Sequence, residues 1–80
     1  MKQITVTYFA ELRERAGLDS ETISTDSDSL SELYLELKSK YAFPLEPSVT
    51  QVARNDEFSS MDAGFEDGDK IVFIPPVAGG

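Results

Sequence analysis

The sequence predicts an α+β fold in which a mixed β-sheet carries one main helix across one face. Three observations predict it: an alternating apolar stretch near the start, one helical apolar stripe in the middle and an unbroken apolar strand near the end. The chain has 80 residues, which is the size of one small domain. We therefore expect residues 1–80 to form a single domain.

The first predicted elements are a strand, a short helix and a second strand. Residues 3–9 alternate and are rich in β-branched and aromatic side chains, so we expect Phe9 to point away from the core. The residues of this strand expected to face the core are Ile4, Val6 and Tyr8. Residues 10–16 predict a short helix, which Gly17 ends because glycine adopts a left-handed cap. Residues 18–25 are mostly polar, which favours an exposed edge strand paired with the first.

The main helix has the clearest periodic signal in the chain. Its apolar stripe consists of Leu30, Leu33, Tyr34, Leu37 and Tyr41. Ser29 and Glu32 have the spacing of a capping box, which marks the start of the helix. Pro44 restricts the residue before it, so the helix is expected to end near Ala42.

The second half of the chain is predicted to add three strands. Residues 48–54 and 57–59 form two of them, joined by a tight turn at 55–56. Residues 71–74 are apolar at every position, as in a central strand covered on both faces. This order favours the β-grasp architecture. The alternative, a ferredoxin-like fold, requires a second full helix between residues 55 and 70, where glycines and a turn oppose one.

Composition excludes several classes of function. The chain has no cysteine and no histidine, which removes thiol nucleophiles, the commonest general base and nearly all zinc sites. Its formal charge is -8, so nucleic acid and anionic membranes are poor partners, and a protein with a basic face fits better. The first residues lack the apolar core of a signal peptide, and we expect a cytoplasmic protein.

The last ten residues contain no charged side chain, although 28% of the chain is charged. Pro75 and Pro76 favour an extended stem, so we expect residues 75–80 to project as a tail. Gly79 and Gly80 have no Cβ, which lets the backbone pass through a narrow channel in another protein. The reactive group presented there is the α-carboxylate of Gly80. The alternative is an inert, frayed end.

A docking surface is predicted from the same alternation. If the core-facing residues of the first and last strands face the helix, then Phe9, Val72 and Ile74 lie on the opposite face of the sheet. Phe58 on the short strand joins them. Such an exposed apolar patch beside the tail is typical of a partner interface. The alternative is that the short helix and loops cover these residues as a second small core.

Two segments resemble one family, the small sulfur-carrier subunits of molybdopterin synthase. They are residues 8–17 (YFAELRERAG) and 65–80 (FEDGDKIVFIPPVAGG), and the resemblance spans nearly the whole chain. It implies a ubiquitin-like β-grasp protein that forms a heterotetramer with a large catalytic subunit. Arg13 matches the arginine of the first motif and is expected to pair with a partner carboxylate, although a surface salt bridge is an alternative. Arg54 departs from the family, whose members usually have an apolar residue there.

The resemblance also implies a chemistry. An ATP-dependent activating enzyme adenylates the carboxylate of Gly80, which becomes a thiocarboxylate and gives its sulfur to a cyclic pyranopterin. The carrier itself binds no cofactor, and the catalytic side chains belong to its partners. The implied partner contacts, together with those predicted from alternation, are Phe9, Arg13, Phe58, Ile74, Pro75, Pro76, Val77 and Ala78. The alternatives are a thiamine-pathway sulfur carrier, a ubiquitin-like protein modifier and a plain interaction domain.

Overall fold

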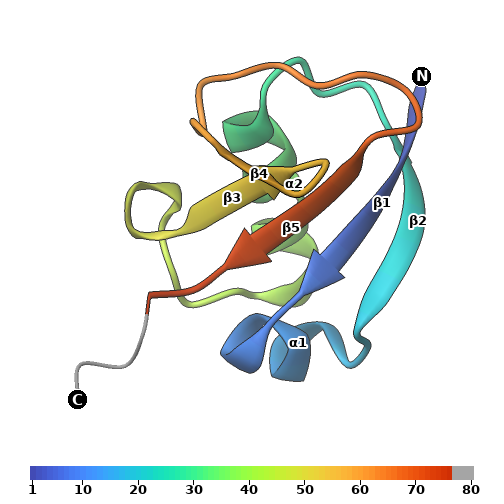
Figure 1. The fold of residues 1–80 in the computed structure, drawn as a ribbon. Coiled ribbons are helices and arrows are strands. Elements are labelled where there is room, and N and C mark those ends of the chain that lie inside the picture. The colour runs from blue at the N-terminus through green and yellow to red at the C-terminus, as the bar shows by residue number, and fades with distance from the viewer. Residues whose placement is uncertain (77–80) are drawn as a thin grey trace.

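The computed structural model describes residues 1–76 and contains the elements in the predicted order. They are β1 (Lys2–Tyr8), α1 (Ala10–Ala16), β2 (Ser20–Thr25), α2 (Leu30–Tyr41), the 3-10 turn η1 (Pro47–Val49), β3 (Gln51–Arg54), β4 (Glu57–Ser59) and β5 (Lys70–Ile74). The five strands form one sheet in the order β2-β1-β5-β3-β4 (Figure 1). β1 and β5 are parallel, and the other neighbouring pairs are antiparallel.

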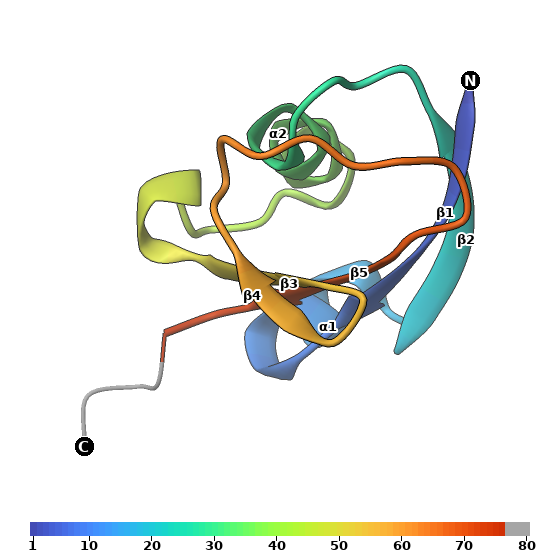
Figure 2. The same ribbon diagram turned by 45° about the horizontal axis from the view of Figure 1, so that its top comes forward.

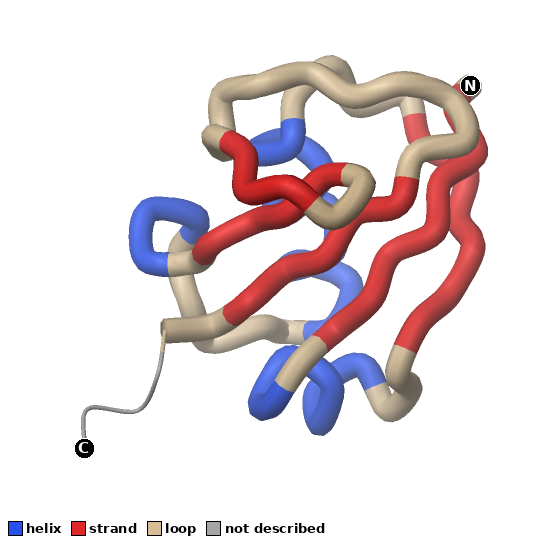
Figure 3. The backbone as a smooth tube through the Cα atoms, in the orientation of Figure 1, coloured by secondary structure: helices blue, strands red, loops and turns tan. Residues whose placement is uncertain are grey.

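This arrangement is the β-grasp fold. The main helix α2 lies across one face of the sheet, whereas α1 lies at the end where β1 and β5 finish (Figures 1 and 2). Between β4 and β5 the described chain runs as a long loop along the opposite end of the sheet (Figure 3). A ferredoxin-like fold would need a helix in that place, so this alternative is excluded.

The core lies between α2 and the sheet. Its buried apolar residues are Ile4, Val6, Tyr8, Leu12, Leu30, Leu33, Tyr34, Leu37, Phe43, Val52, Phe65, Ile71 and Phe73. The core-facing residues predicted for the first strand are thus confirmed, and so is the helical stripe, although Tyr41 is only partly buried. Phe43 was expected only to follow the end of the helix. It is 2% exposed and packs between Tyr8, Tyr34 and Tyr41, with ring centroids 5.7–5.8 Å away.

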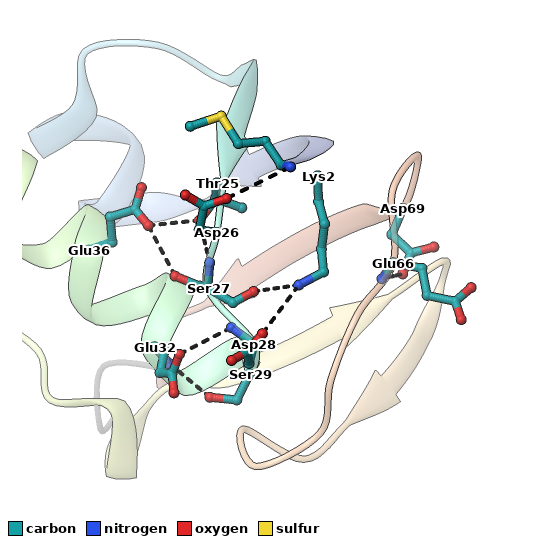
Figure 4. Close-up of polar contacts among 11 residues, drawn as sticks. Lys2, Thr25, Asp26, Ser27, Asp28, Ser29, Glu32, Glu36, Glu66 and Asp69 are labelled. Atoms are coloured by element: carbon teal, nitrogen blue, oxygen red, sulfur yellow. Dashed lines mark hydrogen bonds and ion pairs between the residues drawn. The ribbon is translucent and has the colours of Figure 1, made fainter.

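The N-terminus of α2 has the predicted cap, with one difference. Ser29 Oγ accepts a hydrogen bond from the Glu32 N–H at 3.1 Å, but the Glu32 carboxylate accepts from the N–H of Asp28 (Figure 4). The loop before β5 supplies two more acceptors, because the carbonyl groups of Ala63 and Met61 bind the N–H groups of the first two helical residues at 2.9 and 2.7 Å. These bonds satisfy donors that a helix start leaves unpaired, and they hold the loop against α2.

The structure corrects one end of two predicted strands. The first ends at Tyr8, and Phe9 is the N-cap of α1, with an extended backbone but outside the sheet. The strand predicted from residue 48 begins at Gln51, because Pro47 starts a 3-10 turn that Thr50 closes by donating to its carbonyl group at 3.2 Å. Both corrections lie at the end of the sheet from which the C-terminal segment leaves.

Candidate functional site at the root of the C-terminal segment

The C-terminal segment begins at the central strand of the sheet. β5 pairs with β1 on one side and with β3 on the other. Ile71 and Phe73 face α2 and are fully buried, whereas Val72 and Ile74 alternate with them on the other face and are partly buried. A strand paired on both sides has its backbone groups occupied over its length. The root of the segment is therefore fixed.

The two prolines after β5 differ in their surroundings. Pro75 is buried and Pro76 is exposed, so the buried body includes the first residue of the predicted tail. The C-terminal end of the described chain lies beyond β5 (Figure 1). Neither proline has an N–H group to continue the ladder with β3. The expected tail residues Val77, Ala78, Gly79 and Gly80 lie outside the described residues.

An apolar row crosses the sheet face opposite α2, which we call the open face. Val72 on β5 pairs with Ala53 on β3, and Ala53 pairs with Phe58 on β4, so the three side chains share this face. Ile74 lies two residues beyond Val72. Phe58 is 75% exposed, so no second small core covers it. The sequence prediction identified Ile74 and Phe58 but missed Ala53, whose place in the row depends on strand register.

Phe9 lies at the junction of β1 and α1, and Arg13 lies within α1. The extended backbone of Phe9 continues the alternation of β1, which places its side chain on the side of the open face, and it is 47% exposed. The carbonyl group of Phe9 accepts hydrogen bonds from the N–H groups of Leu12 and Arg13 at 3.1 and 3.4 Å. Arg13 Nε lies 3.6 Å from Asp19 Oδ1, and both side chains are more than half exposed. This contact is the surface salt bridge that the sequence allowed, and it leaves the guanidinium accessible.

The open face carries little charge. Alternation and register assign to it Gln3, Thr5, Thr7, Ser20, Thr22, Ser24, Gln51, Ala53, Phe58, Lys70, Val72 and Ile74. Lys70 is the only charged residue in this set, and its Nζ pairs with Asp56 Oδ1 at 3.1 Å. The face is therefore nearly neutral in a protein with 15 acidic residues. Docking on the strand residues of this face therefore desolvates few charges, and the one carboxylate paired with them is already neutralised by Lys70.

Asp69 holds the start of β5 in place. Its carboxylate accepts hydrogen bonds from Arg54 Nε at 2.6 Å, Asn55 Nδ2 at 3.0 Å and the Glu66 N–H at 2.8 Å. Burial works to raise the pKa of Asp69, but the bonds from Asn55, Glu66 and Arg54 outweigh it and hold the pKa below its usual value. This contact explains how a charged residue is accommodated at position 54, where the family usually has an apolar one. The Arg54 guanidinium pairs with the carboxylate of Asp69, which comes from the loop before β5.

A second polar network joins β1, β2 and the end of α2. Glu21 Oε2 accepts hydrogen bonds from the hydroxyl groups of Tyr8 and Tyr41, each at 2.6 Å. Burial, followed by the bond to Glu21, raises the pKa of Tyr8 far above its ordinary value. Tyr8 therefore stays neutral and ties β1 to β2, while Tyr41 ties the end of α2 to the same carboxylate.

Within residues 1–76 no three acidic side chains gather closely enough to hold a metal ion. No helix in the same residues combines the length and apolar character needed to cross a membrane. The reactive carboxylate predicted from the sequence belongs to Gly80, which lies outside the described residues.

Comparison with known proteins gives concordant results. The model of the ThiS family matches residues 6–80. The molybdopterin synthase sulfur carrier subunits of Escherichia coli K12 and Haemophilus influenzae are 32% and 31% identical to this chain, over 96% of it and 99% of each relative.

Two solved structures are informative. One is the complex of subunits 1 and 2 of the molybdopterin-converting factor from Helicobacter pylori, with 28% identity, a TM-score of 0.65 and coverage of 98% of this chain and 99% of the matched chain. The other is the small archaeal modifier protein 1 of Haloferax volcanii, with a TM-score of 0.80 and coverage of 96% and 100%. Its identity is only 22%, so this likeness shows a shared fold alone.

Proposed function

Because this chain belongs to the ThiS family, we propose that it is the sulfur-carrier subunit of a molybdopterin synthase. The observation that carries the proposal is the match to two carriers of that name over 96% of the chain. The absence of cysteine agrees with it, since a protein without thiols must carry sulfur on another group. The α-carboxylate of Gly80 is that group.

The chemistry requires two activation steps by a partner. An oxygen of the Gly80 carboxylate attacks the α-phosphorus of ATP on an activating enzyme, and pyrophosphate leaves. A sulfur donor at the oxidation level of sulfide then attacks the acyl carbon, and AMP leaves with the bonding electron pair, which gives a thiocarboxylate. Its sulfur attacks a carbon of the cyclic pyranopterin, and a carbon–oxygen bond at that carbon breaks with its electron pair leaving on the oxygen. Water then hydrolyses the resulting thioester, which leaves the sulfur on the pterin and returns the carboxylate of Gly80. The carrier binds neither ATP nor a cofactor of its own in this scheme.

The open face supplies the docking contacts in this proposal. The large subunit packs on the row formed by Val72, Ala53 and Phe58, with Phe9 at its edge, while the residues after Pro76 enter its active site. The Helicobacter pylori structure supports the existence of a large-subunit partner, because there subunits 1 and 2 of the molybdopterin-converting factor form a complex. An apolar row with few charges around it is the type of surface that partners bury at the centre of an interface.

The alternatives are separated by activity. A thiamine-pathway carrier also acquires a thiocarboxylate, but it does not convert cyclic pyranopterin to molybdopterin. A ubiquitin-like modifier forms an isopeptide bond between Gly80 and a lysine of another protein. The fold shared with the archaeal modifier favours neither a sulfur carrier nor a protein modifier, since both classes of protein have this architecture.

Intact-mass spectrometry tests the proposal directly. After co-expression with the activating enzyme and a sulfur donor, we expect a mass gain equal to replacement of one oxygen by sulfur at Gly80, and conversion of cyclic pyranopterin when the large subunit is added. Deletion of Gly80 should abolish both without changing the melting temperature. Sulfur transfer by the truncated chain, or a thiocarboxylate that never yields molybdopterin, would reject the assignment.

The docking face has a separate test. Phe9→Arg places a charge at the edge of the apolar row, and we expect weaker binding to the large subunit because that charge must lose water on docking. Thr22→Arg is a matched control on the same face, at the far strand β2. Equal loss in both variants would show that the contact is not centred on the row.

A further inference from the structure

The turn between β1 and α1 contains a residue in an unfavourable backbone conformation. Ala10 has a φ of +50°, in the left-handed region where the Cβ of an L-residue crowds the following carbonyl oxygen. Gly17 and Gly68 also have positive φ, but glycine has no Cβ and pays no such penalty. Strained residues persist only where the surrounding structure fixes them, and they gather at functional sites.

Two buried residues fix the conformation of Ala10. Tyr8 is 1% exposed, its N–H donates to the carbonyl group of Asp19 at 2.8 Å, and its hydroxyl donates to Glu21 at 2.6 Å. Leu12, on the other side of Ala10, is completely buried in the core. Between these anchors the chain must change from strand to helix within three residues. The left-handed residue makes that change of direction.

This turn leaves the side chain of Phe9 exposed. The backbone of Phe9 stays extended and its carbonyl group accepts the first two hydrogen bonds of α1. The Phe9 side chain is 47% exposed, although the nearby Tyr8 and Leu12 are buried. The geometry points to Ala10 as a positioning residue, whose left-handed conformation presents the Phe9 side chain to the docked large subunit. This role rests on the proposed function and deepens it. A residue that cannot adopt a positive φ should turn Phe9 away and weaken docking without touching the partner.

A double-mutant cycle tests the inference. Ala10→Val disfavours positive φ because its side chain is β-branched, and we expect binding to the large subunit to weaken about tenfold, close to the effect of Phe9→Ala. The combined variant should bind no worse than Phe9→Ala alone, because Ala10 acts through Phe9. Ala10→Gly tolerates the same φ and should bind within about twofold of the unchanged chain.

The chain offers a matched control at Ala42. This exposed alanine has a φ of +58° at the end of α2, so Ala42→Val imposes the same backbone cost at a site remote in the sequence from Phe9. We expect it to lower stability as Ala10→Val does and to leave binding unchanged. An equal loss of binding in Ala42→Val, or additive losses from Ala10→Val and Phe9→Ala, would overturn the inference.

A measurement on the carrier alone tests whether Ala10 fixes the position of Phe9. In amide NMR spectra, Ala10→Val should shift the Leu12 and Arg13 signals, whose N–H groups bind the Phe9 carbonyl, whereas Ala10→Gly should leave them nearly in place. Unmoved signals in Ala10→Val would refute the positioning role whatever the partner. If the unchanged chain fails to bind the large subunit, the proposed function fails and the docking role of Phe9 fails with it. Loss of the role of Ala10 alone leaves the proposed function intact.

Discussion

Replacing Asp69 by asparagine removes the charge that anchors the start of β5. The carboxylate accepts from Arg54, Asn55 and the Glu66 N–H, and the Asp69 side chain is only 11% exposed. Asp69→Asn retains one acceptor oxygen but turns an N–H₂ group toward donors. The loop before β5 and the turn between β3 and β4 then lose the group that joins them.

The cost follows from the number and type of these bonds. A hydrogen bond to a charged group contributes about 1.5–3 kcal/mol, and we expect a net loss of about 2–3 kcal/mol because the asparagine keeps part of the set. A domain of this size has a free energy of unfolding of about 4–12 kcal/mol. The melting temperature should therefore fall by roughly 10–20 °C.

The pH dependence separates charge from packing. The folded pKa of Asp69 lies below its usual value, so its stabilisation is complete above the unfolded pKa of about 4 and is lost as the pH falls through the folded pKa. In urea unfolding, the difference between Asp69→Asn and the unchanged chain should be constant from about pH 7 to pH 5 and should shrink below about pH 4. Asp62→Asn, at an exposed carboxylate, is the matched control. A difference that persists unchanged at low pH would refute the assignment to the carboxylate charge.

Three further outcomes are expected. Gly17→Ala should cost about 1 kcal/mol in urea unfolding, because φ is +78° while a Cβ would meet no atom within 4 Å; a larger cost would indicate contacts that the structure lacks. Tyr8→Phe should cost about 1–2 kcal/mol. Because the folded pKa of Tyr8 is raised, the unchanged chain should also lose stability above about pH 10, where only the unfolded tyrosine ionises, and Tyr8→Phe should lose less. Phe58→Ser should change stability by less than about 0.5 kcal/mol, since Phe58 is 75% exposed, yet weaken calorimetric binding to the large subunit; unchanged affinity would remove β4 from the interface.

Local patterns were enough to predict the order of the elements. The spacing of Leu30, Leu33 and Leu37 and the Ser29 cap are properties of a few adjacent residues, and the structure confirms them. Local patterns do not predict interactions between residues that are far apart in the sequence. Arg54 meets Asp69 only because the loop before β5 returns beside β3, and Phe43 enters the core because the chain after α2 folds back under Tyr34.

The candidate site was predicted only in part, because it depends on strand pairing as well as on local alternation. Alternation within single strands placed Ile74 and Phe58 on the open face, as the register confirms, but alternation does not tell which residues lie opposite one another. Ala53 belongs to the row only through its pairing with Val72 and Phe58, which alternation along one strand does not predict. Phe9 was assigned to a strand because no sequence signal marks a left-handed alanine; the buried anchors on either side impose it.

The apolar row on the open face and the net negative charge of the chain have opposite effects on association. A row with the exposed Phe58 and the partly buried Val72 favours association with any apolar surface, including a second copy of the chain. A formal charge of -8 opposes self-association, because like charges on two copies repel. If the acids lay on the open face they would also oppose the proper partner, since each would have to lose water on docking. No acidic strand residue faces that side of the sheet, so the carrier repels a second copy while its docking row itself carries no charge.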